Sequence, residues 1–138
     1  MIMRKTLQGA VFVLTATIAG LLASVSHADE VSFSSAQVEQ GEALYVQYCQ
    51  VCHGTKLDNG QFATPIKGFF FSNSWGGKTL GELARYTWEE MPKGNGKSLR
   101  VEEYIATIAF ILSNNGIEAG DVPMSEDFSA LDAIPLSF

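Results

Sequence analysis

The chain has 138 residues, of which 46% are hydrophobic and 17% are charged, and its formal net charge is −6 at pH 7. This length suits one compact domain behind a short leader. The acidic balance gives no support to nucleic-acid binding, because proteins that bind nucleic acids carry basic patches.

Residues 1–28 have the pattern of a secretory signal peptide, which predicts a periplasmic location. Basic residues at the N-terminus precede a mostly apolar run over 7–25, and residues 26–28 put small side chains at the positions that a signal peptidase recognises. An uncleaved membrane anchor is the alternative, because the run is nearly long enough to span a bilayer. Polar residues within the run favour cleavage, which leaves 29–138 as a single domain.

A first helix is predicted to begin near Ser35, which is a candidate N-cap. One face of this helix carries Val38, Gly41, Tyr45 and Tyr48 at helical spacing. Glycine inside a helix costs about 1 kcal/mol relative to alanine, so it often marks a place where two backbones approach. We expect a close crossing with a later helix, with Tyr104 and Ile108 opposite Gly41. A surface glycine is the alternative.

The pentapeptide Cys49-Gln50-Val51-Cys52-His53 follows this helix and has the C-x-x-C-H pattern of a covalent haem attachment site. In such a site each thiol adds across a haem vinyl group, and the histidine lies within reach of the iron. We therefore expect one haem c that is bound by Cys49 and Cys52 and has His53 as an iron ligand.

Two cysteines at this spacing can also serve as a redox dithiol, as zinc ligands or as a disulfide. A redox dithiol of the thioredoxin kind belongs to a strand–helix unit, and no strand-like run precedes Cys49. A structural zinc site needs four ligands. Residues 29–138 contain no third cysteine and no histidine besides His53, since His27 belongs to the predicted leader. A disulfide between Cys49 and Cys52 would close too short a loop to restrain the chain.

Two further helices are predicted in the second half of the chain. Thr79 and Glu82 form a capping-box pattern at the start of one. The other follows Ser98 and ends at 114–116, where a glycine can adopt the left-handed conformation. Its apolar face carries Val101, Tyr104, Ile105, Ile108, Ile111 and Leu112. Strand-like alternation persists nowhere, so the sequence predicts an all-α fold with about three main helices.

In this order, the motifs resemble those of the class I cytochrome c family over nearly all of residues 29–138. The resemblance rests on Gly41 and Tyr45 in the first helix, the haem motif with Gly54, the segment Thr64-Pro65-Ile66-Lys67-Gly68, Trp75, Met91-Pro92 and Tyr104. It implies a cytochrome c-like fold wrapped around one covalently bound haem. The stretch over 91–121 is similar, more narrowly, to cytochrome c subunits or domains that accept electrons from pyrroloquinoline-quinone dehydrogenases.

Elimination narrows the second iron ligand to a methionine. Within residues 29–138, His53 is the one histidine and the porphyrin uses both cysteines, which leaves Met91 and Met124. Met91 lies on a loop shaped by proline and glycines and matches the family's distal methionine, whereas Met124 is interpreted as a packing residue. We therefore expect His53 and Met91 to be the axial ligands. A soft, neutral thioether favours Fe(II) and raises the reduction potential.

The resemblance also implies roles for Pro65 and Trp75 beside the cofactor. In that family a proline carbonyl accepts a hydrogen bond from the ligand histidine, and Pro65 is at the matching position. A proline that only stiffens a turn is the alternative. The indole N–H of Trp75 matches the family's donor to a haem propionate, although a buried indole also finds other acceptors. The run of phenylalanines over 69–71 is expected to keep water from the haem.

The charges of residues 29–138 are unevenly distributed. All seven basic residues lie between Lys56 and Arg100, where four carboxylates oppose them, and the other eleven carboxylates lie before or after this stretch. We expect the less negative stretch to surround the haem edge and to orient the docking of a partner. Solvated charge without a partner is the alternative.

The leading hypothesis is a periplasmic carrier of single electrons and not an enzyme. The expected partners are redox proteins, with a quinoprotein dehydrogenase as donor and an oxidase or another cytochrome as acceptor. A membrane enters only if the leader is uncleaved. One alternative is a cytochrome subunit held on a dehydrogenase complex. Another is a haem enzyme or gas-binding protein, which would need an open axial position and, for enzyme chemistry, a distal acid–base group.

Overall fold

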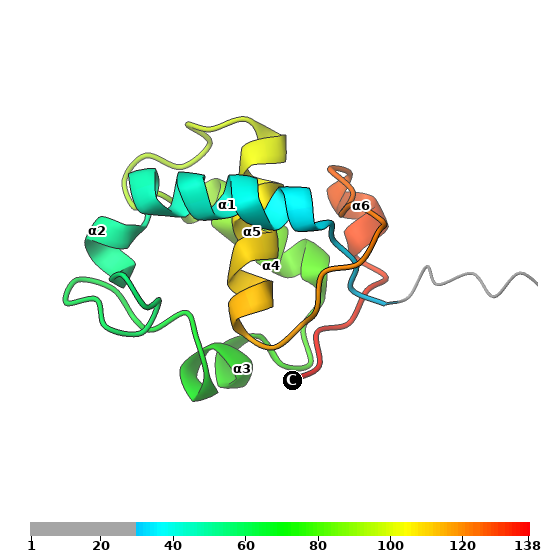
Figure 1. Cartoon of the computed structure of the whole chain (residues 1–138), viewed down its shortest axis with the longest axis horizontal. Coiled ribbons are helices and arrows are strands. Elements are labelled where there is room, and N and C mark those ends of the chain that lie inside the picture. The colour runs from blue at the N-terminus through cyan, green and yellow to red at the C-terminus, as the bar shows by residue number, and fades with distance from the viewer. Residues whose placement is uncertain (1–29) are drawn as a thin grey trace, which may run out of the picture.

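Residues 30–138, which the computed structural model describes, form six helices and no β-strand (Figure 1). They are α1 (Ser35–Tyr48), α2 (Gln50–His53), α3 (Phe69–Trp75), α4 (Leu80–Glu90), α5 (Val101–Asn114) and α6 (Phe128–Leu131). The predicted all-α class is confirmed, and α1, α4 and α5 are the three predicted helices. The predicted signal peptide lies outside the described residues. None of the described helices has the length and apolar character needed to cross a membrane.

The ends of the three long helices follow local capping chemistry. The N-cap of α1 is Ser34, one residue before the predicted Ser35, and its hydroxyl accepts a hydrogen bond from the Gln37 backbone N–H. The predicted capping box of α4 is confirmed, with Thr79 and Glu82 hydrogen-bonded reciprocally at 2.8 and 3.1 Å. Helix α5 begins at Val101, later than its predicted start after Ser98.

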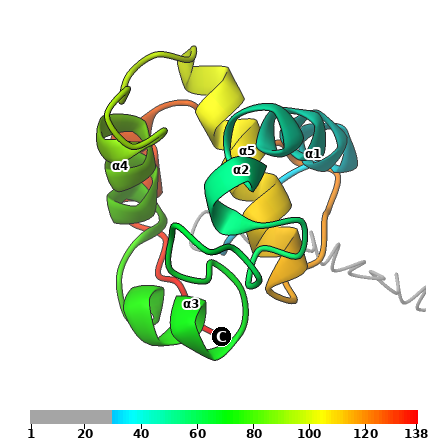
Figure 2. The ribbon, with the colours of Figure 1, turned by 90° about the vertical axis from the view of Figure 1, so that its left-hand side faces the viewer.

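Helix α5 lies at the centre of the molecule, and α1 crosses it closely (Figures 1 and 2). A Cβ atom on Gly41 would overlap the carbonyl of Ala106 and would lie 2.9 Å from the Cβ of Phe110. The rings of Tyr45 and Phe110 pack with their centroids 5.3 Å apart. The predicted close crossing is therefore present.

The predicted partners of Gly41 on α5 were wrong. Ala106 and Phe110 face Gly41, whereas Tyr104 and Ile108 were expected there. A step of two residues turns an α-helix by about 200°, so the two pairs lie on nearly opposite sides of α5. Both sides of α5 are buried, and for this reason the apolar pattern alone did not distinguish them.

The C-terminal segment closes the core beside α4. Leu131 and Leu136 are each 1% exposed. The segment is fixed by backbone hydrogen bonds of 2.8 Å from Leu80 N–H to the Ile134 carbonyl and from Leu136 N–H to the Lys78 carbonyl. The C-terminus consequently lies beside α3 (Figures 1 and 2).

Candidate haem site

A mostly apolar pocket of about 460 Å³ lies between α2 and α4, and residues of α5 form its base. Figure 2 shows this end of the molecule, with α2 and α4 on different sides and α5 behind them. The apolar lining includes Ile66, Phe71, Trp75, Leu83, Met91, Pro92 and Ile111. The volume falls within the range of roughly 300–1,000 Å³ that is common for pockets that bind cofactors and other small molecules.

Cys49 and Cys52 both line this pocket. The short helix α2 places them one turn apart, because the N–H groups of Cys52 and His53 both donate to the Cys49 carbonyl, at 3.1 and 3.0 Å. Residues three apart on a helix share a face. Both thiols are free. Burial, with the neighbouring Cys52 as the smaller cause, raises the pKa of the Cys49 thiol to about 11.

This raised pKa argues against a redox dithiol. A reactive dithiol has a thiolate stabilised by nearby positive charge or a helix N-terminus, which lowers its pKa. A zinc site also lacks support, because residues 30–138 contain no group of three or more His, Cys, Asp or Glu side chains that could hold a metal ion. The pair is instead placed to react with a group that fills the pocket.

His53 is 9% exposed and lines the same pocket. Its Nδ1 lies 3.1 Å from the carbonyl oxygen of Thr64. A carbonyl can only accept, so Nδ1 carries the proton and Nε2 keeps its lone pair. Burial lowers the pKa of His53, and the hydrogen bond to Thr64 opposes this shift. The imidazole is therefore neutral near pH 7, which is the form that binds metals.

The carbonyl that holds His53 belongs to Thr64 and not to Pro65, so the predicted hydrogen-bond role of Pro65 was wrong by one residue. A proline excludes the helical conformation for the residue before it and keeps that residue extended. Pro65 thus restricts the conformation of Thr64, whose carbonyl meets the ring. The next residue, Ile66, fixes the segment through a hydrogen bond of 2.8 Å from its N–H to the Leu57 carbonyl.

Met91 reaches the pocket from the C-terminal end of α4, where it is the C-cap residue. Its carbonyl accepts a hydrogen bond of 2.7 Å from the Tyr104 hydroxyl. Met124, in contrast, is 4% exposed within the core, and its backbone is held by the Gln37 side chain at 2.8 and 3.0 Å. The prediction that Met124 is a packing residue is confirmed.

Trp75 lines the pocket from the end of α3, where its ring packs against that of Tyr86 at 5.3 Å. The amino group of Lys78 lies 4.7 Å from the indole centroid. The expectation that Phe69, Phe70 and Phe71 together exclude water was wrong. Phe71 is 2% exposed, but Phe69 and Phe70 are 76% and 60% exposed. Successive residues of a helix point about 100° apart, and so three in a row cannot share one wall.

The pocket therefore combines two thiols, a neutral imidazole nitrogen and a thioether sulfur with apolar walls. This donor set fits a haem that is attached through two thioether bonds. The sequence analysis named Thr64 and Tyr104 but gave them no role at the site, where they act through a main-chain carbonyl and a hydroxyl. For Thr64, the sequence did contain one signal, which is the proline that follows it and restricts its backbone conformation.

The model of the family described as cytochrome c oxidase, cbb3-type, subunit III matches residues 36–111. The chain belongs to this family. It is a class I c-type cytochrome, and its cofactor is haem c with iron, bound covalently. Neither the curated proteins nor the solved structures with which the chain was compared gave a match. The matched residues run from α1 into α5 and include the whole C-x-x-C-H motif.

Proposed function

We propose that this cytochrome is a periplasmic monohaem electron carrier with His53 and Met91 as axial ligands of the iron. The observation that carries the proposal is the hydrogen bond from His53 Nδ1 to the Thr64 carbonyl, which leaves Nε2 for the iron in the pocket that Met91 also lines. The bound haem supplies a one-electron couple. The thioether favours its Fe(II) form and so raises the reduction potential relative to two imidazoles.

The surrounding residues support electron transfer over enzyme chemistry. A haem enzyme needs an open axial position and a group that moves protons. Among the described residues that line the pocket, His53 is the one imidazole, and the carbonyl of Thr64 already fixes its Nδ1 proton. With Met91 on the iron, small ligands such as carbon monoxide would find no free position. Apolar walls exclude water and reduce the reorganisation that accompanies a change of charge.

The location and the domain boundaries belong to the proposal. Residues 1–28 have the signal-peptide pattern, and a cleaved leader would release residues 29–138 into the periplasm. The likeness of residues 91–121 to subunits of pyrroloquinoline-quinone dehydrogenases makes such a quinoprotein the proposed donor. An oxidase or another cytochrome is the proposed acceptor.

A subunit held on a larger complex is the second candidate. The family's description names an oxidase subunit, and this is the observation that supports a stable assembly as the second candidate. The two candidates share their haem chemistry. They differ in whether an untagged redox protein co-purifies with this chain in a fixed ratio from its native membrane and periplasmic fractions.

The axial ligands can be tested with two matched variants of the haem-loaded protein. Leucine is close to methionine in volume but has no sulfur, so Met91→Leu should open the iron and allow the reduced protein to bind carbon monoxide. Met124→Leu is the control, because Met124 lies in the core and not in the pocket. The wild type and Met124→Leu should keep a low-spin spectrum and resist carbon monoxide. An unaltered spectrum in Met91→Leu would reject the assignment.

A further inference from the structure

The Tyr104 hydroxyl lies between the two ends of the segment that carries Met91. Tyr104 is 2% exposed and projects from the first turn of α5. Its hydroxyl donates to the Met91 carbonyl at 2.7 Å and accepts from the Ser98 backbone N–H at 3.2 Å. A phenolic hydroxyl has one proton to donate, so its donor capacity is fully used. We call residues 91–98 the ligand loop.

Other contacts hold the ligand loop to itself and to α4. The N–H of Asn95 donates to the Pro92 carbonyl, and the N–H of Lys97 donates to the Trp88 carbonyl, both at 2.8 Å. The ion pair between Lys93 and Glu90 is solvent-exposed, and pairs of this kind add little stability. Among the described residues, the hydrogen bonds between the ligand loop and α5 both involve the Tyr104 hydroxyl.

We propose that Tyr104 is a positioning residue for the Met91 ligand. It ties both ends of the ligand loop to the most deeply buried helix of the domain. A movement of the loop that drew Met91 away from the iron would have to stretch or break the hydrogen bonds of Tyr104. The hydroxyl thus sets how readily an external ligand replaces the thioether. This inference rests on the proposed axial ligation by His53 and Met91.

The test compares Tyr104→Phe with Tyr45→Phe in the haem-loaded protein. Each variant removes one buried hydroxyl that donates to a backbone carbonyl, because Tyr45 is 1% exposed and donates to the Gly54 carbonyl at 2.6 Å. The hydroxyl of Tyr45 lies on the His53 side of the site and does not contact the ligand loop. The two changes are therefore matched in chemistry and burial but differ in the loop that they release.

The measurement is the affinity of the ferric protein for imidazole, which competes with Met91 for the iron. Tyr104→Phe should bind imidazole about tenfold more tightly than the wild type, since a lost buried hydrogen bond corresponds to about 1.4 kcal/mol. Tyr45→Phe should stay close to the wild-type affinity even if it lowers the unfolding midpoint as much. Equal affinities in both variants would overturn the role of Tyr104.

Failure of this inference can be distinguished from failure of the axial assignment. If Met91 is not a ligand, the Met91→Leu variant will bind imidazole with the same affinity as the wild type. If Met91 is a ligand but Tyr104 does not position it, Met91→Leu will tighten imidazole binding and Tyr104→Phe will not. These two patterns cannot be confused.

Hydrogen exchange in the wild-type protein provides a test that needs no variant, should Tyr104→Phe fail to mature. The Ser98 amide is protected through Tyr104. Saturation with imidazole should displace the ligand loop and speed the exchange of this amide. The amide of Cys49, the C-cap residue of α1, donates to the Tyr45 carbonyl and should keep its rate. An unchanged exchange rate at Ser98 would contradict the proposal.

Discussion

Gly41 determines how closely α1 approaches α5. The backbone of α5 at Ala106 occupies the space that a side chain on residue 41 would need. This close approach also brings Tyr45 against Phe110 and lets its hydroxyl reach the Gly54 carbonyl, directly after His53. The lack of a side chain at Gly41 therefore determines where the haem-binding turn begins relative to α5.

Gly41→Ala should destabilise the protein, although alanine is the better helix former. The gain in helix propensity is about 1 kcal/mol. Overpacking against a backbone carbonyl typically costs about 1–3 kcal/mol and can cost more, and the structure puts Gly41 at the severe end. Chemical denaturation of the haem-loaded protein measures the net change. Glu42→Ala, at an exposed position of the same helix, is the control and should stay within about 0.5 kcal/mol of wild type. A neutral or stabilising Gly41→Ala would refute the close crossing.

At the scale of elements, the C-terminal segment is held to α4 by a charged pair. The Arg85 guanidinium bonds both carboxylate oxygens of Asp132 and so holds the pKa of that carboxyl below its ordinary value. A carboxyl whose folded-state pKa is lowered stabilises the fold above its unfolded-state pKa. That stabilisation disappears as the pH falls through the lowered folded-state value.

Asp132→Asn should therefore flatten the acid dependence of stability below the ordinary aspartate pKa of 3.8. Thermal unfolding of the haem-loaded protein between neutral pH and strongly acidic pH measures this. The variant should be less stable than the wild type at neutral pH, and the difference should shrink as the pH falls. Asp121→Asn, at an exposed carboxyl outside the described ion pairs, should preserve the wild-type profile. Parallel profiles for wild type and Asp132→Asn would show that the pair does not hold the segment.

The elements that the sequence predicted are those whose signals are local. Thr79 and Glu82 are three residues apart and cap α4 without help from the rest of the chain. Gly116 has a φ of 91°, as the predicted end of α5 requires. The buried Leu131 and Leu136 have no such signal, because their burial depends on α4 being in place. The site divides in the same way. The contiguous motif of Cys49 to His53 could be predicted, but the Thr64 carbonyl could not be assigned, because every residue has a carbonyl and only the folded loop selects one.

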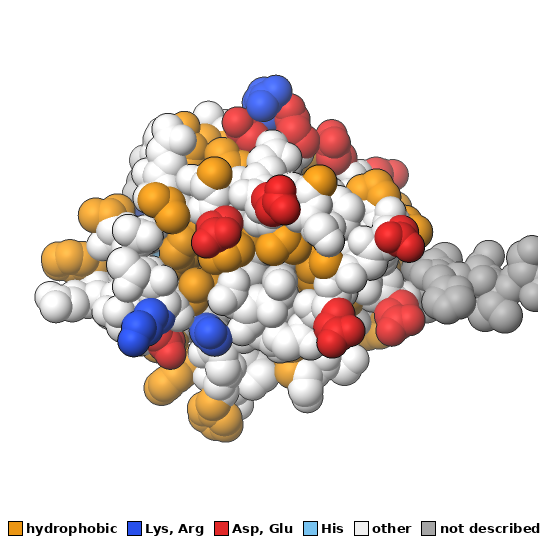
Figure 3. All heavy atoms as spheres, viewed as in Figure 1, with side chains coloured by type: hydrophobic (Ala, Val, Ile, Leu, Met, Phe, Trp, Pro, Cys, Tyr) orange, Lys and Arg blue, Asp and Glu red, His pale blue; other side chains and the backbone are white. Residues whose placement is uncertain are grey.

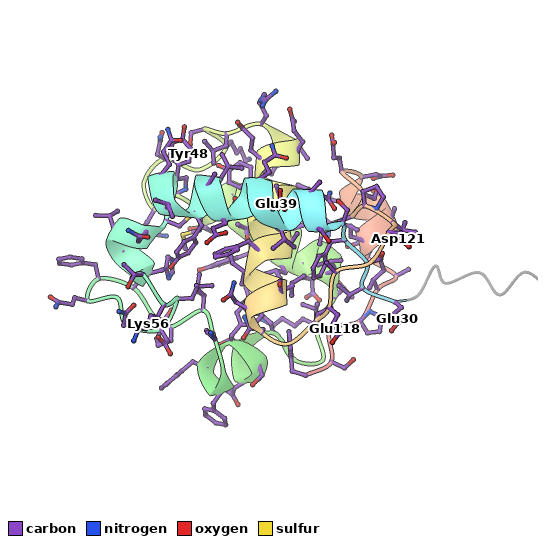
Figure 4. All side chains as sticks on the ribbon, viewed as in Figure 1. Glu30, Glu39, Tyr48, Lys56, Glu118 and Asp121 are labelled. Carbon is purple, nitrogen blue, oxygen red and sulfur yellow. The ribbon has the colours of Figure 1, made fainter. Side chains whose placement is uncertain are left out.

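At the scale of the whole molecule, the two ends differ in charge. Lys56 lies beside α2, whereas Glu30, Glu118 and Asp121 lie at the opposite end (Figures 3 and 4). Lys56 forms no ion pair with any of the described residues. We therefore expect its charge to act on an approaching partner. A local field of this kind changes association rates more than affinity, and salt screens it.

Lys56→Glu should slow electron transfer from the reduced protein to hexacyanoferrate(III) several-fold at low ionic strength. The anion meets a more negative potential beside α2 in this variant. Stopped-flow absorbance over a range of salt concentrations measures the rates, which should converge at high salt. Glu118→Lys changes the charge by the same amount at the far end and should have a smaller effect. A salt-independent difference, or an equal effect of Glu118→Lys, would exclude steering by this end.

The central claim is that the haem is joined to Cys49 and Cys52 in the apolar pocket, and mass spectrometry tests it most directly. The protein should be produced in a bacterial host that matures c-type cytochromes, extracted with acid acetone and digested. The account predicts that the peptide containing residues 49–53 carries the mass of one haem after extraction, and that Cys49→Ala with Cys52→Ala abolishes this mass. An unmodified peptide from pigmented wild-type protein, with the pigment recovered in the acetone, would contradict it.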